Sequence, residues 1–61
     1  MTEKLYDRLA EIEDEINLLE DRHDEAIATD DFNELMIISA RVDKLNEEID
    51  EIEELLEAAE S

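Results

Sequence analysis

Apolar residues recur along this chain at alternating spacings of four and three, in two separate runs. This is the heptad pattern of packed helices, in which positions a and d face a partner helix. The first run has d at Leu5, Ile12, Leu19 and Ala26 and a at Leu9, Ile16 and His23. The second has a at Leu35, Val42, Ile49 and Leu56 and d at Ile38, Leu45, Ile52 and Ala59. We therefore predict helices over about residues 2–28 and 32–59, joined by a turn at 29–31.

The two runs mirror each other about this turn. Folding the chain at this turn sets Leu5 against Leu56, and further facing pairs follow from there to the turn. Each a residue then faces a d residue, as an antiparallel pair requires. A single unbroken helix is the alternative, since the chain has no Gly or Pro to forbid it. The step from Ala26 to Leu35 breaks the heptad phase, however, and favours a turn. The predicted fold is all-α: an antiparallel two-helix hairpin, with residues 1–61 as one domain.

Helix-capping residues agree with this division. Thr2 can cap the first helix, and Glu3 places negative charge at its N-terminus. Thr29, Asp30 and Asp31 are three consecutive N-cap residues before the second helix. Asp31 with Glu34 matches a capping box, so we expect the second helix to begin directly after residue 31.

A hairpin of 61 residues has a narrow core, and small chains usually need a partner or a staple to be stable. The predicted interaction core is Leu5, Leu9, Ile12, Ile16, Leu19, Ala26, Leu35, Ile38, Val42, Leu45, Ile49, Ile52 and Leu56. Further apolar residues lie outside it: Tyr6, Leu18, Ile27, Phe32, Met36, Ile37 and Leu55. Because one seam cannot bury all of these, we expect two hairpins to form a homodimeric four-helix bundle that draws in Tyr6, Ile27 and Leu55.

Three of the additional apolar residues, Phe32, Met36 and Ile37, cluster just after the turn. They are a candidate contact patch for a partner. The alternative is a local plug that closes the end of the hairpin, and this is the reading that we favour from the sequence.

The chain carries 22 acidic and five basic residues, for a net charge of −17. This charge repels phosphates and anionic lipids, so we expect no direct nucleic-acid or membrane partner. An external partner, if there is one, should be basic, although the acidic surface can also serve solubility alone. No apolar run is long enough to span a membrane, and we expect a cytoplasmic protein.

Candidate chemistry is sparse. His23 is the only histidine and falls at an a position. It is either a polar group that fixes register or senses pH, or a partly solvated residue near the turn that bonds a nearby carboxylate or hydroxyl. Carboxylate pairs at helical spacing are abundant, as expected in so acidic a chain. The chain has no Cys and neither a calcium-loop nor a di-iron motif. We therefore expect no metal, no cofactor and no enzyme activity.

The stretch from Leu19 to Leu45 resembles the UVR motif, a helical hairpin of bacterial excision-repair proteins. The matching positions are Leu19, Glu20, Ala26, Asp31, Phe32, Ile38, Val42 and Leu45. The departures are His23 for Met, Asn33 for Glu, Leu35 for Ala, and Ser39 and Ala40 for the usual Arg-Asp. The resemblance implies a hairpin used for protein-protein contact.

Two further resemblances concern the second helix. Residues 39–45 are similar to the Ser-x-Glu-Leu-Asp-x-Leu signature of small phosphatases that act on sporulation response regulators, with Arg41 in place of the Glu. The alternation of acidic and apolar residues also resembles the carboxy-terminal coiled coils of ABC-F ATPases. From these observations we expect a non-catalytic, homodimerising interaction or assembly module. The alternatives are an acidic inhibitor that mimics nucleic acid on a basic surface, and a small response-regulator phosphatase.

Overall fold

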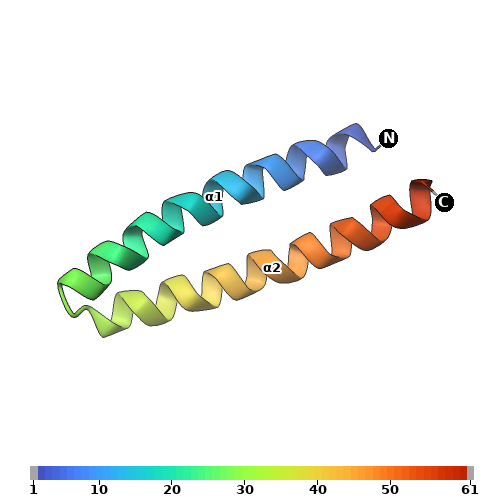
Figure 1. The fold of residues 1–61 in the computed structure, drawn as a ribbon. Helices are drawn as coiled ribbons and strands as arrows, with labels where there is room; N and C mark the ends of the chain where they lie inside the picture. Colours follow the sequence, from blue (N-terminus) through green and yellow to red (C-terminus); the bar gives the residue numbers. More distant parts are fainter. Residues whose placement is uncertain (1, 61) are drawn as a thin grey trace.

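The computed structural model describes residues 2–60 and consists of two long helices folded back on each other. Helix α1 spans Glu3–Ala28 and helix α2 spans Phe32–Glu60. Figure 1 shows them side by side along their length, with the turn at one end and the start of α1 and the end of α2 at the other. The rod measures 46 × 15 × 11 Å. The predicted all-α antiparallel hairpin is confirmed, and the helix bounds lie within one residue of those expected.

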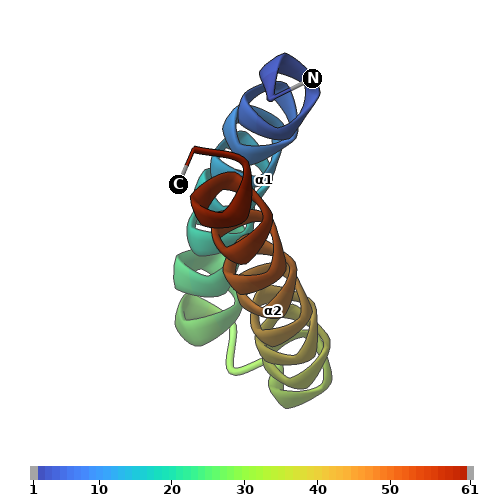
Figure 2. The same ribbon diagram turned by 90° about the vertical axis from the view of Figure 1, so that its right-hand side faces the viewer.

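The two helices form a single layer, as the end-on view in Figure 2 makes plain. Each helix therefore has one neighbour and leaves most of its circumference to solvent. Within the part of the chain that the structure describes, neither helix has a stretch that is both long and apolar enough to cross a membrane.

The turn closes α1 with a Schellman motif, although the chain contains no glycine. The amide of Asp31 donates to the carbonyl of Ala26 at 2.9 Å, and the amide of Asp30 donates to that of Ile27 at 3.2 Å. Asp30 takes the left-handed conformation that the motif needs, with φ of 55°. Aspartate tolerates this region better than most residues because its short polar side chain hydrogen-bonds locally. The Thr29 hydroxyl donates to the carbonyl of Glu25 at 3.1 Å.

Asp31 caps α2 as the sequence predicted. The amide of Glu34 donates to Asp31 Oδ1 at 3.2 Å, which is one half of a capping box. Thr2 behaves differently from the expectation. It occupies the N-cap position of α1, but its side chain makes no capping hydrogen bond. Its own φ and ψ are already helical, at −72° and −20°, so only its carbonyl takes part, accepting from Leu5 and Tyr6.

The core runs along the facing sides of the two helices. Its buried members are Ile12, Leu19, Ala26, Ile38, Leu45, Ile52 and Leu56. The other predicted core residues are partly buried and pack against them: Leu5, Leu9, Ile16, Leu35, Val42 and Ile49. Every residue of the predicted interaction core thus lies in or against the seam.

Two positions of the heptad pattern depart from the prediction that they belong to the seam. His23 and Ala59 are both exposed. The imidazole of His23 makes no hydrogen bond within residues 2–60, so the expected bond to a nearby carboxylate or hydroxyl does not form. The imidazole stays in water because the single-layered hairpin does not enclose this side of the seam.

The prediction that Phe32, Met36 and Ile37 form a local plug at the end of the hairpin is also wrong. The side chains of Phe32, Met36 and Ile37 are 73%, 72% and 63% exposed. The short turn brings α2 directly against α1, so the first residues of α2 have no further chain to close over. Their apolar surface faces solvent in the hairpin.

Candidate interaction face

The two heptad positions of the seam are not equally covered. Six of the seven buried residues are at position d, and Ile12, Leu45 and Ile38 have only 0%, 1% and 2% of their surface exposed. Position a is half-covered at Leu9, Ile16, Leu35, Val42 and Ile49. In an antiparallel hairpin the a residues of both helices lie toward one broad side and the d residues toward the other. One side of this hairpin is therefore closed, and the other is open.

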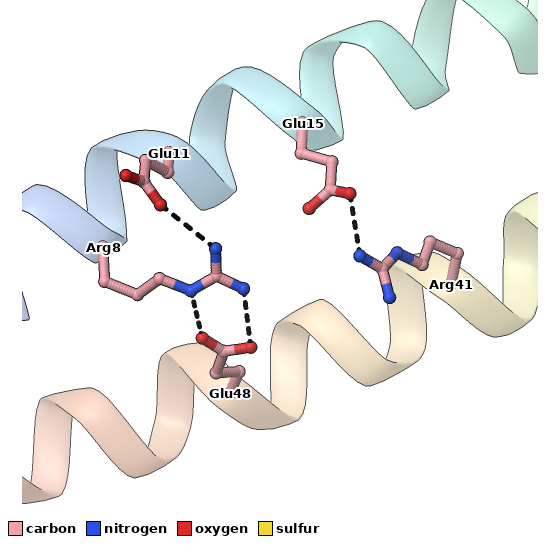
Figure 3. Close-up of polar contacts among 5 residues, drawn as sticks. All are labelled: Arg8, Glu11, Glu15, Arg41 and Glu48. Atoms are coloured by element: carbon pink, nitrogen blue, oxygen red, sulfur yellow. Dashed lines mark hydrogen bonds and ion pairs between the residues drawn. The ribbon is translucent and has the colours of Figure 1, made fainter.

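Charged residues at position g close the d side. The guanidinium of Arg8 on α1 binds the carboxylate of Glu48 on α2 through Nε and through Nη2, the latter at 3.0 Å. One heptad further along, Arg41 Nη2 on α2 donates to Glu15 Oε1 on α1 at 2.8 Å. Figure 3 shows these cross-helix pairs side by side, with the cation supplied first by α1 and then by α2. We call this side the ladder face.

The same spacing places a third pair, Arg22 and Glu34, nearest the turn. The two residues line an open pocket of about 290 Å³ together with Thr29 and Asp31. No ion pair joins Arg22 to Glu34 among the described residues. Within residues 2–60, the ladder face therefore has two cross-helix ion pairs, which we call its first rung (Arg8 with Glu48) and its second rung (Arg41 with Glu15). The third pair of residues, Arg22 and Glu34, forms no ion pair in this range.

The first rung also shifts the protonation of its members. The hydrogen bonds that Arg8 donates to Glu48, and secondarily to Glu11, raise the pKa of Arg8. The hydrogen bonds from Arg8 lower the pKa of Glu48, and this outweighs the opposing effect of desolvation. Both side chains are still more than a third exposed, so the pair lies at the surface and covers the seam without being buried in it.

The opposite side has no such closure, and we call it the open face. It consists of the half-covered a residues, flanked by the e residues of both helices: Tyr6, Glu13, Glu20, Ile27, Phe32, Ser39, Asn46, Glu53 and Glu60. All of these e residues are exposed. Among residues 2–60, one cross-helix side-chain hydrogen bond forms on this face, at the open end of the hairpin, where the Tyr6 hydroxyl donates to Glu60. That hydrogen bond raises the pKa of Tyr6.

A shallow groove of about 250 Å³ interrupts the open face near the turn. Its walls include Leu19 and Ile38 from the core, Val42 from position a, and the exposed His23 and Ser39. The groove exists because His23 turns toward water where an apolar a residue would cover Leu19 and Ile38. Apolar side chains at its base are thus reachable from outside.

Basic residues are confined to the ladder side. The three arginines occupy position g, and Lys4 and Lys44 stand at position c, immediately before the d residues Leu5 and Leu45. Positions c and g lie on the same side of a helix as d. Neither the e nor the b row of either helix contains a Lys or Arg. The open face is accordingly an apolar strip between acidic margins.

Chemical function finds little support in this arrangement. The described residues contain no group of three or more His, Asp or Glu side chains placed to hold a metal ion. Ser39 is exposed at the edge of the groove, and Arg41, which stands in place of the glutamate of the phosphatase signature, is engaged with Glu15.

The ladder face was missed in the reasoning from sequence. Its signal is present in the chain, since Arg8, Glu15 and Arg22 follow one another at heptad spacing. Glu34, Arg41 and Glu48 do the same with the opposite order of charge. Comparing position g between the two runs finds all three pairs, whereas attention to apolar residues alone does not.

Comparisons with protein-family models, curated proteins and solved structures find no match to this chain. The resemblances to the UVR motif, the sporulation phosphatases and the ABC-F coiled coils therefore stay predictions.

Proposed function

We propose that this protein is a non-catalytic interaction module that homodimerises through its open face, forming a four-helix bundle. The observation that carries the proposal is the unequal covering of the seam: six of the eight d residues are buried, whereas only one of the seven a residues, Leu56, is. In a four-helix bundle each helix needs two neighbours, one on its d side and one on its a side. The hairpin supplies the first neighbour, and a second hairpin on the open face supplies the other.

The energetic balance favours association despite the charge. Completing the burial of one half-covered Leu, Ile or Val is worth about 1 kcal/mol, and each copy contributes five such a residues. Like-charge contacts between exposed carboxylates cost about 0.2–1 kcal/mol each, and physiological salt screens them further. Apolar burial is thus the larger effect. It also compensates for the small core of the isolated hairpin, in which only seven side chains are buried.

The proposal is tested by the oligomeric state of matched variants. Ile16 is a half-covered a residue of the open face, and Leu18 is 65% exposed and lies at position c. Ile16→Glu should give a monomer in analytical ultracentrifugation, because it places a charge in the dimer seam, whereas Leu18→Glu should leave the wild-type dimer intact. Circular dichroism reports whether each variant stays helical. A wild-type chain that is a folded monomer at micromolar concentration contradicts the proposal.

A second function, that of an acidic inhibitor of a basic surface, is favoured by one specific observation. The e and b rows of both helices carry no cation, so a basic partner on the open face would meet carboxylates on either side of an apolar strip. This function predicts binding that weakens steeply with added salt and that competes with DNA or RNA for the partner. It ranks second because the apolar a residues need no foreign partner to become covered.

A further inference from the structure

The seam residues differ in size between the two ends of the hairpin. At the open end the facing pairs are Leu5 with Leu56 and Leu9 with Ile52, all large and apolar. At the turn end they are His23 with Ile38 and Ala26 with Leu35, so each pair contains a polar or a small residue. A bundle of two hairpins must accommodate this gradient in some way.

We propose that two copies dock through their open faces with their turns at opposite ends. The inference rests on the proposed dimer and specifies how its two chains are arranged. In this arrangement α1 runs antiparallel to the partner's α1, and α2 to the partner's α2. Leu5 and Leu56 then share a layer with the partner's His23 and the partner's Ile38.

Packing volume supports this arrangement over the one with both turns at the same end. With opposite ends, the layer of His23 and Ile38 meets the partner's Leu5 and the partner's Leu56, so the two histidines lie in different layers and each has large residues beside it. With turns together, the two His23 residues would share one layer and the two Ala26 residues another, while the leucines crowd at the far end. Cores pack to uniform density, with large and small residues facing each other.

The exposed apolar residues at position e support the same choice. Tyr6 and Ile27 are 50% and 52% exposed, and they stand at the two ends of the e row of α1. When α1 lies antiparallel to a second α1, Tyr6 faces the partner's Ile27, and Ile27 faces the partner's Tyr6. With turns together, Tyr6 faces the partner's Glu60, and Ile27 faces the partner's Ser39. The opposite-end arrangement thus covers both residues with each other, whereas turns together leave Tyr6 against a carboxylate.

Charge does not distinguish the two arrangements. Turns at opposite ends bring Glu13 near the partner's Glu20, and turns together bring Glu13 near the partner's Glu53. Each arrangement therefore has one type of acid-acid contact, repeated twice by symmetry. The choice rests on the volumes of the layers and on the covering of Tyr6 and Ile27.

The arrangement makes a definite prediction at the two ends of α1. Tyr6 and Ile27 stand 21 residues apart in the e row, and both are about half exposed. With turns at opposite ends, Tyr6 lies beside the partner's Ile27. With turns together, Ile27 lies beside the partner's Ser39, and Tyr6 lies at the other end of the bundle.

Single cysteines test this prediction without background, because the chain has no Cys of its own. Tyr6→Cys, Ile27→Cys and Ser39→Cys are prepared on chains of different tag length, and cross-linking with a short bismaleimide follows for each refolded mixture. We expect Tyr6→Cys with Ile27→Cys to give the mixed product, and Ile27→Cys with Ser39→Cys to give little. Leu18→Cys is the matched control and should not cross-link.

A mixed product of Ile27→Cys with Ser39→Cys as the main species overturns the arrangement while leaving the dimer intact. A wild-type monomer in light scattering overturns the dimer itself, whether the chain binds nothing or only a basic peptide. A spin label at Asp30→Cys gives a second measurement that does not disturb the core. Opposite ends separate the two labels by roughly the 46 Å length of the rod, whereas turns together place them close to each other.

Discussion

The guanidinium of Arg8 spans the two helices to bind the carboxylate of Glu48, while its third nitrogen, Nη1, binds Glu11 of its own helix at 3.2 Å. Arginine presents its donors in a rigid planar fork, so this geometry fixes the orientation of α1 relative to α2 as well as their separation. The neighbouring pair of Arg41 and Glu15 repeats the contact with the charges exchanged between helices. Both pairs lie on the side of the hairpin where most d residues are enclosed, opposite the side on which most a residues are left open.

A charge reversal at the second pair tests this role. Arg41→Glu places a carboxylate opposite Glu15 and should lower the melting temperature, whereas the double variant Glu15→Arg with Arg41→Glu should recover most of the loss. Because the pair is more than a third exposed, we expect a pair energy of only about 0.5 kcal/mol from the double-mutant cycle. Thermal unfolding followed by circular dichroism measures it. No recovery in the double variant means that the pair does not form.

The pH dependence of the first pair follows from the lowered pKa of Glu48. A carboxyl group whose pKa is lower in the folded than in the unfolded chain stabilises the fold above its unfolded pKa, and this contribution disappears as pH falls through the folded pKa. Wild type should therefore be more stable than Glu48→Gln at pH 7, and the difference should vanish in acid below the usual range of a glutamate. Urea unfolding at a series of pH values measures this difference.

Glu47→Gln is the matched control for that series. It removes one acidic charge from the adjacent, exposed position, where no ion pair forms among the described residues. Its effect on stability should reflect general charge repulsion alone and thus have the opposite sign at pH 7. Equal behaviour of the two variants argues against a specific bond from Arg8 to Glu48.

Much of the fold could be predicted from the sequence because apolar spacing and helix caps are local signals. The break in heptad phase after Ala26 placed the turn, and Asp31 with Glu34 marked where α2 begins. The unequal covering of positions a and d could not be predicted in this way, since the heptad pattern treats them alike. It depends on how far each helix rotates about its axis, which the spacing of apolar residues does not specify. The exposure of His23 and Phe32 has the same origin, because both lie on the side that this rotation leaves open.

The left-handed backbone of Asp30 offers a stabilising substitution. Glycine adopts this conformation without the steric cost that a Cβ incurs, so Asp30→Gly should stabilise the hairpin by about 0.5–1 kcal/mol. Asp30→Asn separates the effect of charge from that of the backbone, since it removes the charge and keeps a side chain. Asp31→Ala should instead destabilise by about 1 kcal/mol, because it removes the acceptor for the amide of Glu34. Chemical denaturation of the three variants should give this order.

Salt should stabilise the protein even though it weakens the ion pairs of the ladder face. The net charge of −17 makes repulsion between carboxylates the larger electrostatic effect, and raising ionic strength from about 0.1 to about 1 M shortens the screening length from about 10 to about 3 Å. The melting temperature should therefore rise with sodium chloride at pH 7. At about pH 3 most carboxylates are protonated, and the rise should be much smaller. A fall in melting temperature with salt at pH 7 indicates that attractive pairs dominate.

Truncation of two isoleucines distinguishes the isolated hairpin from the bundle. Ile12 has no exposed surface in the hairpin, so Ile12→Ala should cost about 2–5 kcal/mol whether or not a second chain is present. Ile16 is only partly buried within one chain, so Ile16→Ala should cost clearly less if the hairpin acts alone. If the open face is covered by a second copy, the two substitutions should cost similar amounts per chain, and Ile16→Ala should also weaken the concentration dependence of unfolding. Urea unfolding at several protein concentrations gives both quantities. If Ile16→Ala lowers the free energy of unfolding only slightly, and by the same amount at every protein concentration, the open face is exposed to solvent and is not covered by a second copy.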